Sequence, residues 1–204
     1  MQSSFLAEIS SDSQIEYSII INPTDSLRNK IIKIKNEIHL KYNESILLNT
    51  RPNIRLSKFF NWEKIEERLT DHLRVTAMAM PPFKVVLKDY GSFPSHTLFI
   101  NVTSRIPLQM LMKGLKALKP LIKSPLAESI FVNEFYIPLA VKLSLPQYEK
   151  IWKDYRNRKF TGNFIADGML LLRRRSGEKN YQIVERFEFM NLPVSGRQGE
   201  LFIQ

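Results

Sequence analysis

Apolar segments of two kinds alternate along this chain, and their order restricts the fold more than any other feature. Strand-like runs rich in β-branched and aromatic residues alternate with segments whose apolar residues recur at helical spacing. The expected strands lie within 15–21, 51–60, 81–104, 131–145 and 164–190, and the expected helices within 22–42, 62–79, 106–123 and 146–160. The regions 81–104 and 164–190 each look like two strands joined by a turn, which favours antiparallel sheets.

The expected elements repeat in two similar halves, each with a short strand before a helix and then a strand pair. Position 136 stands in the second half where position 53 stands in the first, 83 residues earlier. We therefore expect an α+β protein with a two-lobed, pseudo-symmetric fold, in which two antiparallel β-sheets form a central cleft and helices lie outside. The expected boundaries are a polar lead-in at 1–14, one bilobal domain at 15–192 and a tail at 193–204.

The chain is large and apolar enough for a real core, and it is strongly basic. Its 204 residues are 44% hydrophobic, and 30 lysines and arginines against 20 acidic residues give a formal net charge of +10. Such a charge favours anionic partners such as RNA or nucleotides, although a solvated basic surface explains it equally well. In the expected helix at 22–42, the lysines are assigned to the outer face.

Several common site chemistries are excluded by the composition. The chain has no cysteine, and His39, His72 and His96 fall on different expected elements without metal-ligand spacing. Gly-rich phosphate loops and a GxSxG elbow are absent, so we expect no metal and no cofactor. The first residues do not form a secretory signal, and no apolar run has membrane-spanning length. The expectation is a cytoplasmic monomer without membrane contact.

The most prominent basic cluster is the run Arg173, Arg174 and Arg175, which leads into the turn of the last expected hairpin. In a strand these side chains alternate between faces, so at most two of them share one side. The cluster has two interpretations, a phosphate-binding patch or the polar end of an exposed hairpin. The aromatic residues of 146–160 have helical spacing and are assigned to the core.

Two short strands and the segment between them give the chain a resemblance to a known family. In "RPNIRLSKFF" (51–60), polar Asn53 and Arg55 alternate with Ile54 and Leu56, and "EFYIPLAVKL" (134–143) repeats the frame from Tyr136. Between them, "FKVVLKDYGSFPSHTLFINV" has an apolar strand, a Gly-Ser-Phe-Pro turn and a second apolar strand. This order and spacing, over roughly residues 15 to 190, resembles the 2H phosphoesterase superfamily, which includes bacterial RNA 2′,3′-cyclic phosphodiesterases historically called 2′-5′ RNA ligases.

The resemblance implies a site in which both family motifs are altered. The family has His-x-Thr/Ser in each half, whereas this chain has Asn53 and Arg55 in the first half and Tyr136 and Pro138 in the second. An amide cannot take up a proton near neutrality, and a tyrosine with a pKa of about 10 is a poor base. Arg55 keeps its charge and suits a phosphate, while Pro138 offers no donor. No catalytic residue can therefore be assigned from the family.

Three functional hypotheses remain open at this stage. The first is a catalytically degenerate 2H protein that binds a nucleotide, an RNA end or another phosphorylated ligand in a basic cleft. The ligand-binding residues of that hypothesis are Asn53, Arg55, Tyr136, Lys142, Arg173 and Arg175. The second is an active RNA ligase or cyclic phosphodiesterase with rebuilt chemistry, using Tyr136 with His96. The third is a protein-binding scaffold, in which the apolar C-terminal residues of the tail contact the protein itself or a partner.

Overall fold

Two antiparallel sheets form the framework of the protein. The computed structural model describes residues 15–42, 50–94, 96–122 and 130–193. Sheet A has the strand order β5 (Ile130–Phe131), β2 (Ile54–Asn61), β1 (Ile15–Ile21), β8 (Gly168–Arg174) and β9 (Gln182–Glu188). Sheet B has the order β6 (Tyr136–Val141), β4 (Thr97–Val102), β3 (Phe83–Phe93) and β7 (Thr161–Ala166).

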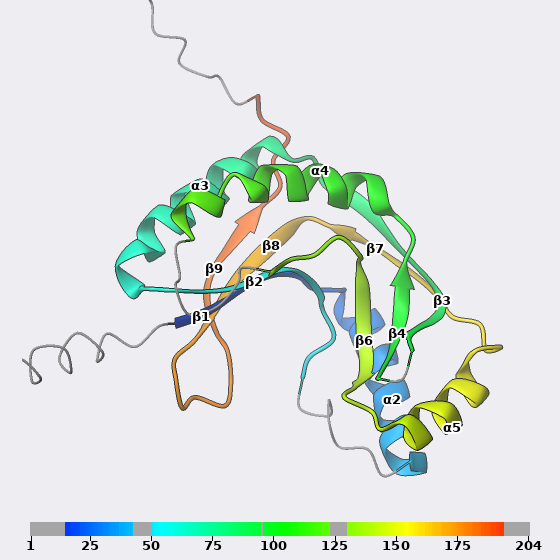
Figure 1. The fold of residues 1–204 in the computed structure, drawn as a ribbon. Helices are drawn as coiled ribbons and strands as arrows, with labels where there is room; N and C mark the ends of the chain where they lie inside the picture. Colours follow the sequence, from blue (N-terminus) through cyan, green and yellow to red (C-terminus); the bar gives the residue numbers. More distant parts are fainter. Residues whose placement is uncertain (1–14, 43–49, 95, 123–129, 194–204) are drawn as a thin grey trace, which may run out of the picture.

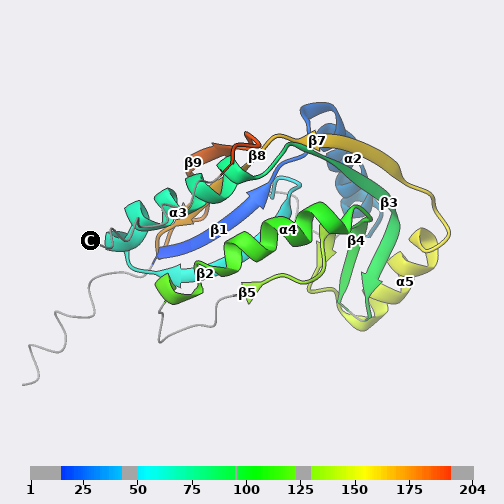
Figure 2. The ribbon, with the colours of Figure 1, turned by 90° about the horizontal axis from the view of Figure 1, so that it is seen from above.

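The four α-helices of the described chain are divided between the two sheets. Helix α3 (Glu66–Ala79), which follows a 3₁₀ turn at Glu63–Ile65, packs against β8 and β9, and α4 (Arg105–Lys116) lies beside α3 (Figures 1 and 2). Helix α2 (Asp25–Tyr42) packs against β6 and β7, and α5 (Leu145–Tyr155) packs against α2 and β4. A second 3₁₀ turn, Lys119–Leu121, follows α4. The predicted α+β fold with two antiparallel sheets is confirmed.

The two faces of sheet A have different surroundings. Tyr17 of β1 stacks on Phe59 of β2 and donates a hydrogen bond to Glu66 of α3, so these rings mark the face that α3 covers. Successive strand residues alternate between faces, and Glu16, Ser18 and Ile20 therefore lie on the face opposite α3. This second face carries the polar residues that matter for the site.

The last predicted strand pair is in fact three strands. The sequence pattern over 164–190 predicts two strands joined by a turn, but β7 pairs with β3 in sheet B and β8 pairs with β1 in sheet A. The chain changes sheets at Asp167 and Gly168. A Cβ at Gly168 would lie 2.6 Å from the carbonyl oxygen of Phe187, so only glycine permits this close approach of β8 to β9.

One lysine of α2 departs from the predicted lysine-rich outer face. Lys35 is only 4% exposed, and its ammonium donates hydrogen bonds to the carbonyl and the hydroxyl of Thr50. Burial lowers the pKa of Lys35 to about 8, because the charged form is less well solvated there. Lys35 thus connects α2 to the segment that leads into β2.

Candidate functional site

The first motif lies at the start of β2 and contains a β-bulge. Ile20 of β1 pairs with Arg55, whereas the preceding residue, Ile19, pairs with Ser57, so Leu56 is the extra residue of β2. Bulges commonly redirect side chains beside functional sites. Strict alternation would place residues 55 and 58 on opposite faces, but the bulge brings Arg55 and Lys58 onto the same face, opposite α3.

The second motif, at the start of β6, has a bulge at the equivalent position. Leu98 of β4 pairs with Ala140 and the next residue, Phe99, pairs with Pro138, which leaves Leu139 as the extra residue. Leu56 and Leu139 are the fourth residues of the two motif frames, and both are buried. Strands β2 and β6 also lie against each other in the fold. The two halves therefore share local backbone geometry as well as sequence spacing.

The first motif presents an amide and a guanidinium that is unpaired among the described residues. The side-chain amide of Asn53 donates a 2.9 Å hydrogen bond to the carbonyl of Arg51, which leaves its own oxygen as an acceptor. Arg55 is exposed and forms no ion pair or hydrogen bond with any residue that the structure describes. This position can bind an anion but cannot transfer a proton at neutral pH.

The second motif presents an aromatic surface. The Tyr136 ring lies 4.8 Å from the Phe99 ring and 5.1 Å from the Phe93 ring, between centroids. Phe99 crosses the backbone of Gly91, where an added Cβ would come within 2.4 Å of the ring, so a larger residue there would displace the ring. Tyr136 is half-buried in this cluster. Its position suits stacking against a flat ligand better than proton transfer.

His96, the proposed partner of Tyr136 in a rebuilt enzyme, is engaged elsewhere. Its ring nitrogen Nδ1 is 2.6 Å from the hydroxyl of Thr97, and its ring contacts Phe93 at 6.0 Å between centroids. Phe93 in turn contacts Tyr136, and the described residues include no hydrogen bond between His96 and Tyr136. This arrangement does not favour an acid–base pair of these two residues.

A buried carboxylate on sheet A gathers several donors on the face opposite α3. Glu16 forms ion pairs with Lys58 at 3.0 Å and with Arg174 at 2.8 Å, and it accepts a hydrogen bond from Tyr181. Burial alone would raise the pKa of Glu16, but the hydrogen bonds from Tyr181, Arg174 and Lys58 outweigh it and lower the pKa below its ordinary value. Two cations thus surround one anion, and the positive charge of Arg55 also reaches Tyr181.

The structure separates the other predicted basic residues from this face. Arg173 pairs in register with Tyr17 on the α3 side, and it forms ion pairs with Glu63 and Glu66. Arg175 also forms an ion pair with Glu63, at 2.5 Å. Lys142 is exposed just beyond β6, in a left-handed backbone conformation with φ of 56°. Asn53 and Arg55 therefore share their surroundings with Lys58 and Arg174, which the sequence interpretation did not select.

The sequence held a partial signal for these residues. Alternation along β8 separates Arg174 from its two neighbours, but it does not say which face is covered by a helix. The position of Lys58 depends on the bulge at Leu56, and short sequence patterns do not reveal bulges. Glu16 and Tyr181 come from opposite ends of the chain and meet only in the folded protein.

Among the described residues there is neither a metal-binding cluster nor a membrane-spanning helix. No group of three or more histidine, aspartate or glutamate side chains among the described residues is arranged to hold a metal ion. Among the described helices, none combines the length and hydrophobicity needed to cross a bilayer.

Solved structures share this fold at low sequence identity. E. coli LigT complexed with 3′-AMP is 14% identical, with a TM-score of 0.64, over 87% of this chain and 98% of that chain. TT0787 of Thermus thermophilus is also 14% identical, with a TM-score of 0.61 over the same fractions. The NADP⁺ complex of E. coli LigT has a TM-score of 0.63 at 13% identity, over 87% of this chain and 99% of that one. Such similarity establishes the fold alone.

The sequence of the chain supplies the family assignment. No curated protein matches it at a significant level. Residues 23–178, which include both motif frames and the hairpin between them, match the description "2'-5' RNA ligase superfamily". The matched range covers most of the chain, and the resemblance to the 2H phosphoesterases is confirmed. The chain therefore belongs to the 2′-5′ RNA ligase superfamily, within the 2H phosphoesterases.

Proposed function

We propose that this protein is a catalytically degenerate 2H phosphoesterase that binds a nucleotide, an RNA end or another phosphorylated ligand between its two motif strands. The single observation that carries the proposal is the exposed Arg55, unpaired among the described residues, on the strand where the family has a catalytic motif. Its guanidinium can donate two parallel hydrogen bonds to a phosphate.

The surroundings of Arg55 support an anionic ligand. Lys58 and Arg174 lie on the same face of sheet A, and only one carboxylate among the described residues, that of Glu16, is hydrogen-bonded to them. The local balance is therefore positive, which agrees with the net charge of +10 of the whole chain. We place the phosphate beside Arg55, with Asn53 supplying an additional polar contact.

The aromatic cluster supports a flat group next to that phosphate. Tyr136 and Phe93 are half-buried, and β6 lies against β2, so a ligand held at Arg55 has an aromatic surface nearby. Stacking of a base on an aromatic side chain typically contributes about 1–3 kcal/mol. E. coli LigT has been solved with 3′-AMP, with NADP⁺ and with phosphate, which agrees with a phosphorylated ligand here.

The loss of catalysis follows from the chemistry of the two altered positions. Asn53 has no titratable group, and Tyr136 has its ring packed against Phe93 and Phe99. Each general acid or base commonly contributes about 10² to 10⁴ in rate, so replacing both removes most of the family reaction. We therefore propose binding without efficient turnover.

Titration calorimetry with 2′,3′-cyclic AMP, 3′-AMP and adenosine tests this proposal. We expect both phosphorylated compounds to bind at least about tenfold more tightly than adenosine, with affinity that falls as salt rises. Analysis of the cyclic nucleotide after incubation should show no hydrolysis. An absence of salt-sensitive binding to these compounds, and to a short RNA with a cyclic phosphate end, would reject the proposal.

Charge-matched variants locate the site. Arg55→Gln should weaken binding of 3′-AMP by about tenfold or more, because a charged hydrogen-bond donor is lost. Arg175→Gln removes the same formal charge on the α3 side, where Arg175 is paired with Glu63, and should change the affinity less than about twofold. Equal losses in the two variants would mean that net charge, rather than a site at Arg55, attracts the ligand.

A further inference from the structure

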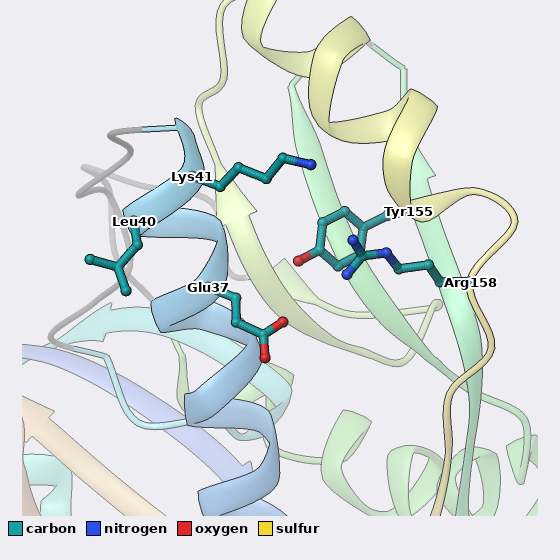
Figure 3. A pocket seen from close by; sticks show the side chains of 5 residues that line it. All are labelled: Glu37, Leu40, Lys41, Tyr155 and Arg158. Atoms are coloured by element: carbon teal, nitrogen blue, oxygen red, sulfur yellow. The ribbon is translucent and has the colours of Figure 1, made fainter.

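A hollow lies between α2 and α5. It has a volume of about 410 Å³ and is lined by Glu37, Leu40, Lys41, Tyr155 and Arg158 (Figure 3). Tyr155 packs edge-on against Tyr90, which pairs with Ile100 on the buried face of sheet B. Tyr136 and its aromatic neighbours lie on the other face of that sheet, so the hollow is separate from the proposed phosphate site. Its volume falls within the range of small-molecule sites.

The floor of the hollow is the buried ring of Tyr155, whose hydroxyl has no hydrogen-bond partner among the described residues. Tyr155 is only 2% exposed, and its hydroxyl points into the space between the helices (Figure 3). This hydroxyl forms no hydrogen bond with any residue that the structure describes. The hydroxyl is not among the fully buried, unpartnered polar atoms of the described residues, so it is accessible from the hollow to a ligand or to water. Burial raises the pKa of Tyr155 to about 12, so it stays a neutral donor at physiological pH.

Two opposite charges face this hydroxyl without neutralising each other. The Arg158 guanidinium lies 4.4 Å from the centroid of the Tyr155 ring, and the Glu37 carboxylate points toward it from α2 (Figure 3). Neither group forms an ion pair with a described residue, whereas the neighbouring Lys41 is paired with Asp154. Both charges are near enough to affect the pKa of Tyr155, Arg158 lowering it and Glu37 raising it.

This arrangement suits a ligand that carries both signs of charge. A simple anion would bind Arg158 but be repelled by Glu37, and a simple cation would meet the opposite problem. A zwitterion can satisfy both groups at once, and charge-assisted hydrogen bonds are the stronger ones. Leu40, which is 83% exposed, offers apolar contact at the edge of the hollow.

We propose that the hollow between α2 and α5 binds a small zwitterion of the amino-acid class. Its carboxylate accepts hydrogen bonds from Arg158 and the Tyr155 hydroxyl, and its ammonium donates to Glu37. Its apolar part lies toward Leu40. The site is independent of the phosphate site, which we place beside Arg55 of sheet A, and of the Tyr136 cluster on the opposite face of sheet B.

Three probes with the same phenyl group but different charged groups test the proposal on the full chain by NMR or calorimetry. They are L-phenylalanine, 3-phenylpropanoate, which lacks the ammonium, and phenethylamine, which lacks the carboxylate. We expect saturable binding of L-phenylalanine, with each singly charged probe at least about tenfold weaker. Equal affinities for the three probes, or no saturable binding of L-phenylalanine up to roughly 10 mM, would overturn the proposal.

Single substitutions assign the contacts. Tyr155→Phe keeps the packed ring and removes only the hydroxyl, and it should weaken L-phenylalanine binding several-fold. Glu37→Gln should abolish the preference for L-phenylalanine over 3-phenylpropanoate, and Arg158→Gln the preference over phenethylamine. Arg156→Gln, an exposed neighbour outside the hollow, is the matched control and should leave binding unchanged. Unchanged binding in all three site variants would also overturn the proposal.

A final variant separates this proposal from the first. Arg55→Gln should weaken 3′-AMP binding and leave L-phenylalanine binding within about twofold, because the two sites lie on different sheets and faces. Loss of both ligands in Arg55→Gln, in a variant that still folds, would contradict two independent sites.

Discussion

Strands β2 and β6 have a β-bulge at equivalent positions but present different side chains. A four-residue motif frame starts at the first residue of β6 and one residue before β2, and each frame ends at a bulged leucine, Leu56 or Leu139. The frame in β2 presents an amide and a guanidinium unpaired among the described residues, whereas the frame in β6 presents an aromatic ring and a proline. The two halves thus share a backbone arrangement while their side chains differ.

This difference shows which constraint belongs to the fold and which belongs to the chemistry. The buried positions of the frames hold the strands in the core, and their replacement would cost stability in either half. The remaining positions of the frames are half-buried or exposed, so their side chains can change function at a smaller cost to folding.

Restoring the family residues in both halves should have the largest effect. The first-half variant combines Asn53→His with Arg55→Thr, and the second-half variant combines Tyr136→His with Pro138→Thr. We expect the native protein and either half-restored variant to leave 2′,3′-cyclic AMP unhydrolysed, and the combined variant to exceed them by about 100-fold or more, since both proton-transfer groups are needed. Product formation over time measures this. Efficient turnover by the native protein, lost in Tyr136→Phe, would instead support a rebuilt enzyme.

The two bulge leucines should contribute equally to stability if the halves share a backbone role. Leu56→Ala and Leu139→Ala should each lower the free energy of unfolding by about 2–5 kcal/mol, since both side chains are buried. Leu40→Ala, at an 83% exposed position, is the control and should change it by less than about 0.5 kcal/mol. Urea unfolding measures all three. A large effect in only one half would break the structural equivalence of β2 and β6.

The buried Lys35 should make the folding stability of the protein depend on alkaline pH. Its folded pKa of about 8 lies below the ordinary value of 10.5, so between these values the unfolded chain binds a proton that the folded protein has released. Folding stability therefore rises with pH in this window, and the penalty for burying the charge is complete below pH 8. Between pH 7 and 10.5, the free energy of unfolding of the native protein should rise by up to about 3 kcal/mol more than that of Lys35→Met. Urea unfolding at several pH values measures this. If the stability of the two proteins changes in parallel with pH, the prediction is wrong.

The polar atoms of the two frames should make small and unequal contributions to stability. Asn53→Ala removes the hydrogen bond to the Arg51 carbonyl and should lower the free energy of unfolding by about 1 kcal/mol. Tyr136→Phe keeps the ring contacts with Phe93 and Phe99 and should change it by less than about 0.5 kcal/mol. Thermal unfolding at one pH compares the two variants. A larger loss in Tyr136→Phe would show that its hydroxyl, rather than its ring, fixes the second motif.

The sequence by itself determined the alternation of strands and helices as far as α5, the antiparallel sheets and the two motif frames 83 residues apart. These features depend on local periodicity and turn residues, which a single chain records directly. Asn53 and Tyr136 could be matched to the family because spacing along a strand survives in the sequence. That neither position holds a histidine is also read from the sequence alone.

Only the tertiary structure decided which charges share a face and which side chains are buried. The bulge at Leu56 brings Lys58 onto the face of Arg55, and strand pairing places Arg174, rather than Arg173, beside Glu16. The lysine-rich pattern of α2 suggests that Lys35 is exposed. It is buried because α2 packs against the segment that leads into β2. The hollow at Tyr155 needs two helices that are distant in sequence. Such features depend on long-range packing and on single breaks in periodicity, neither of which a local pattern records.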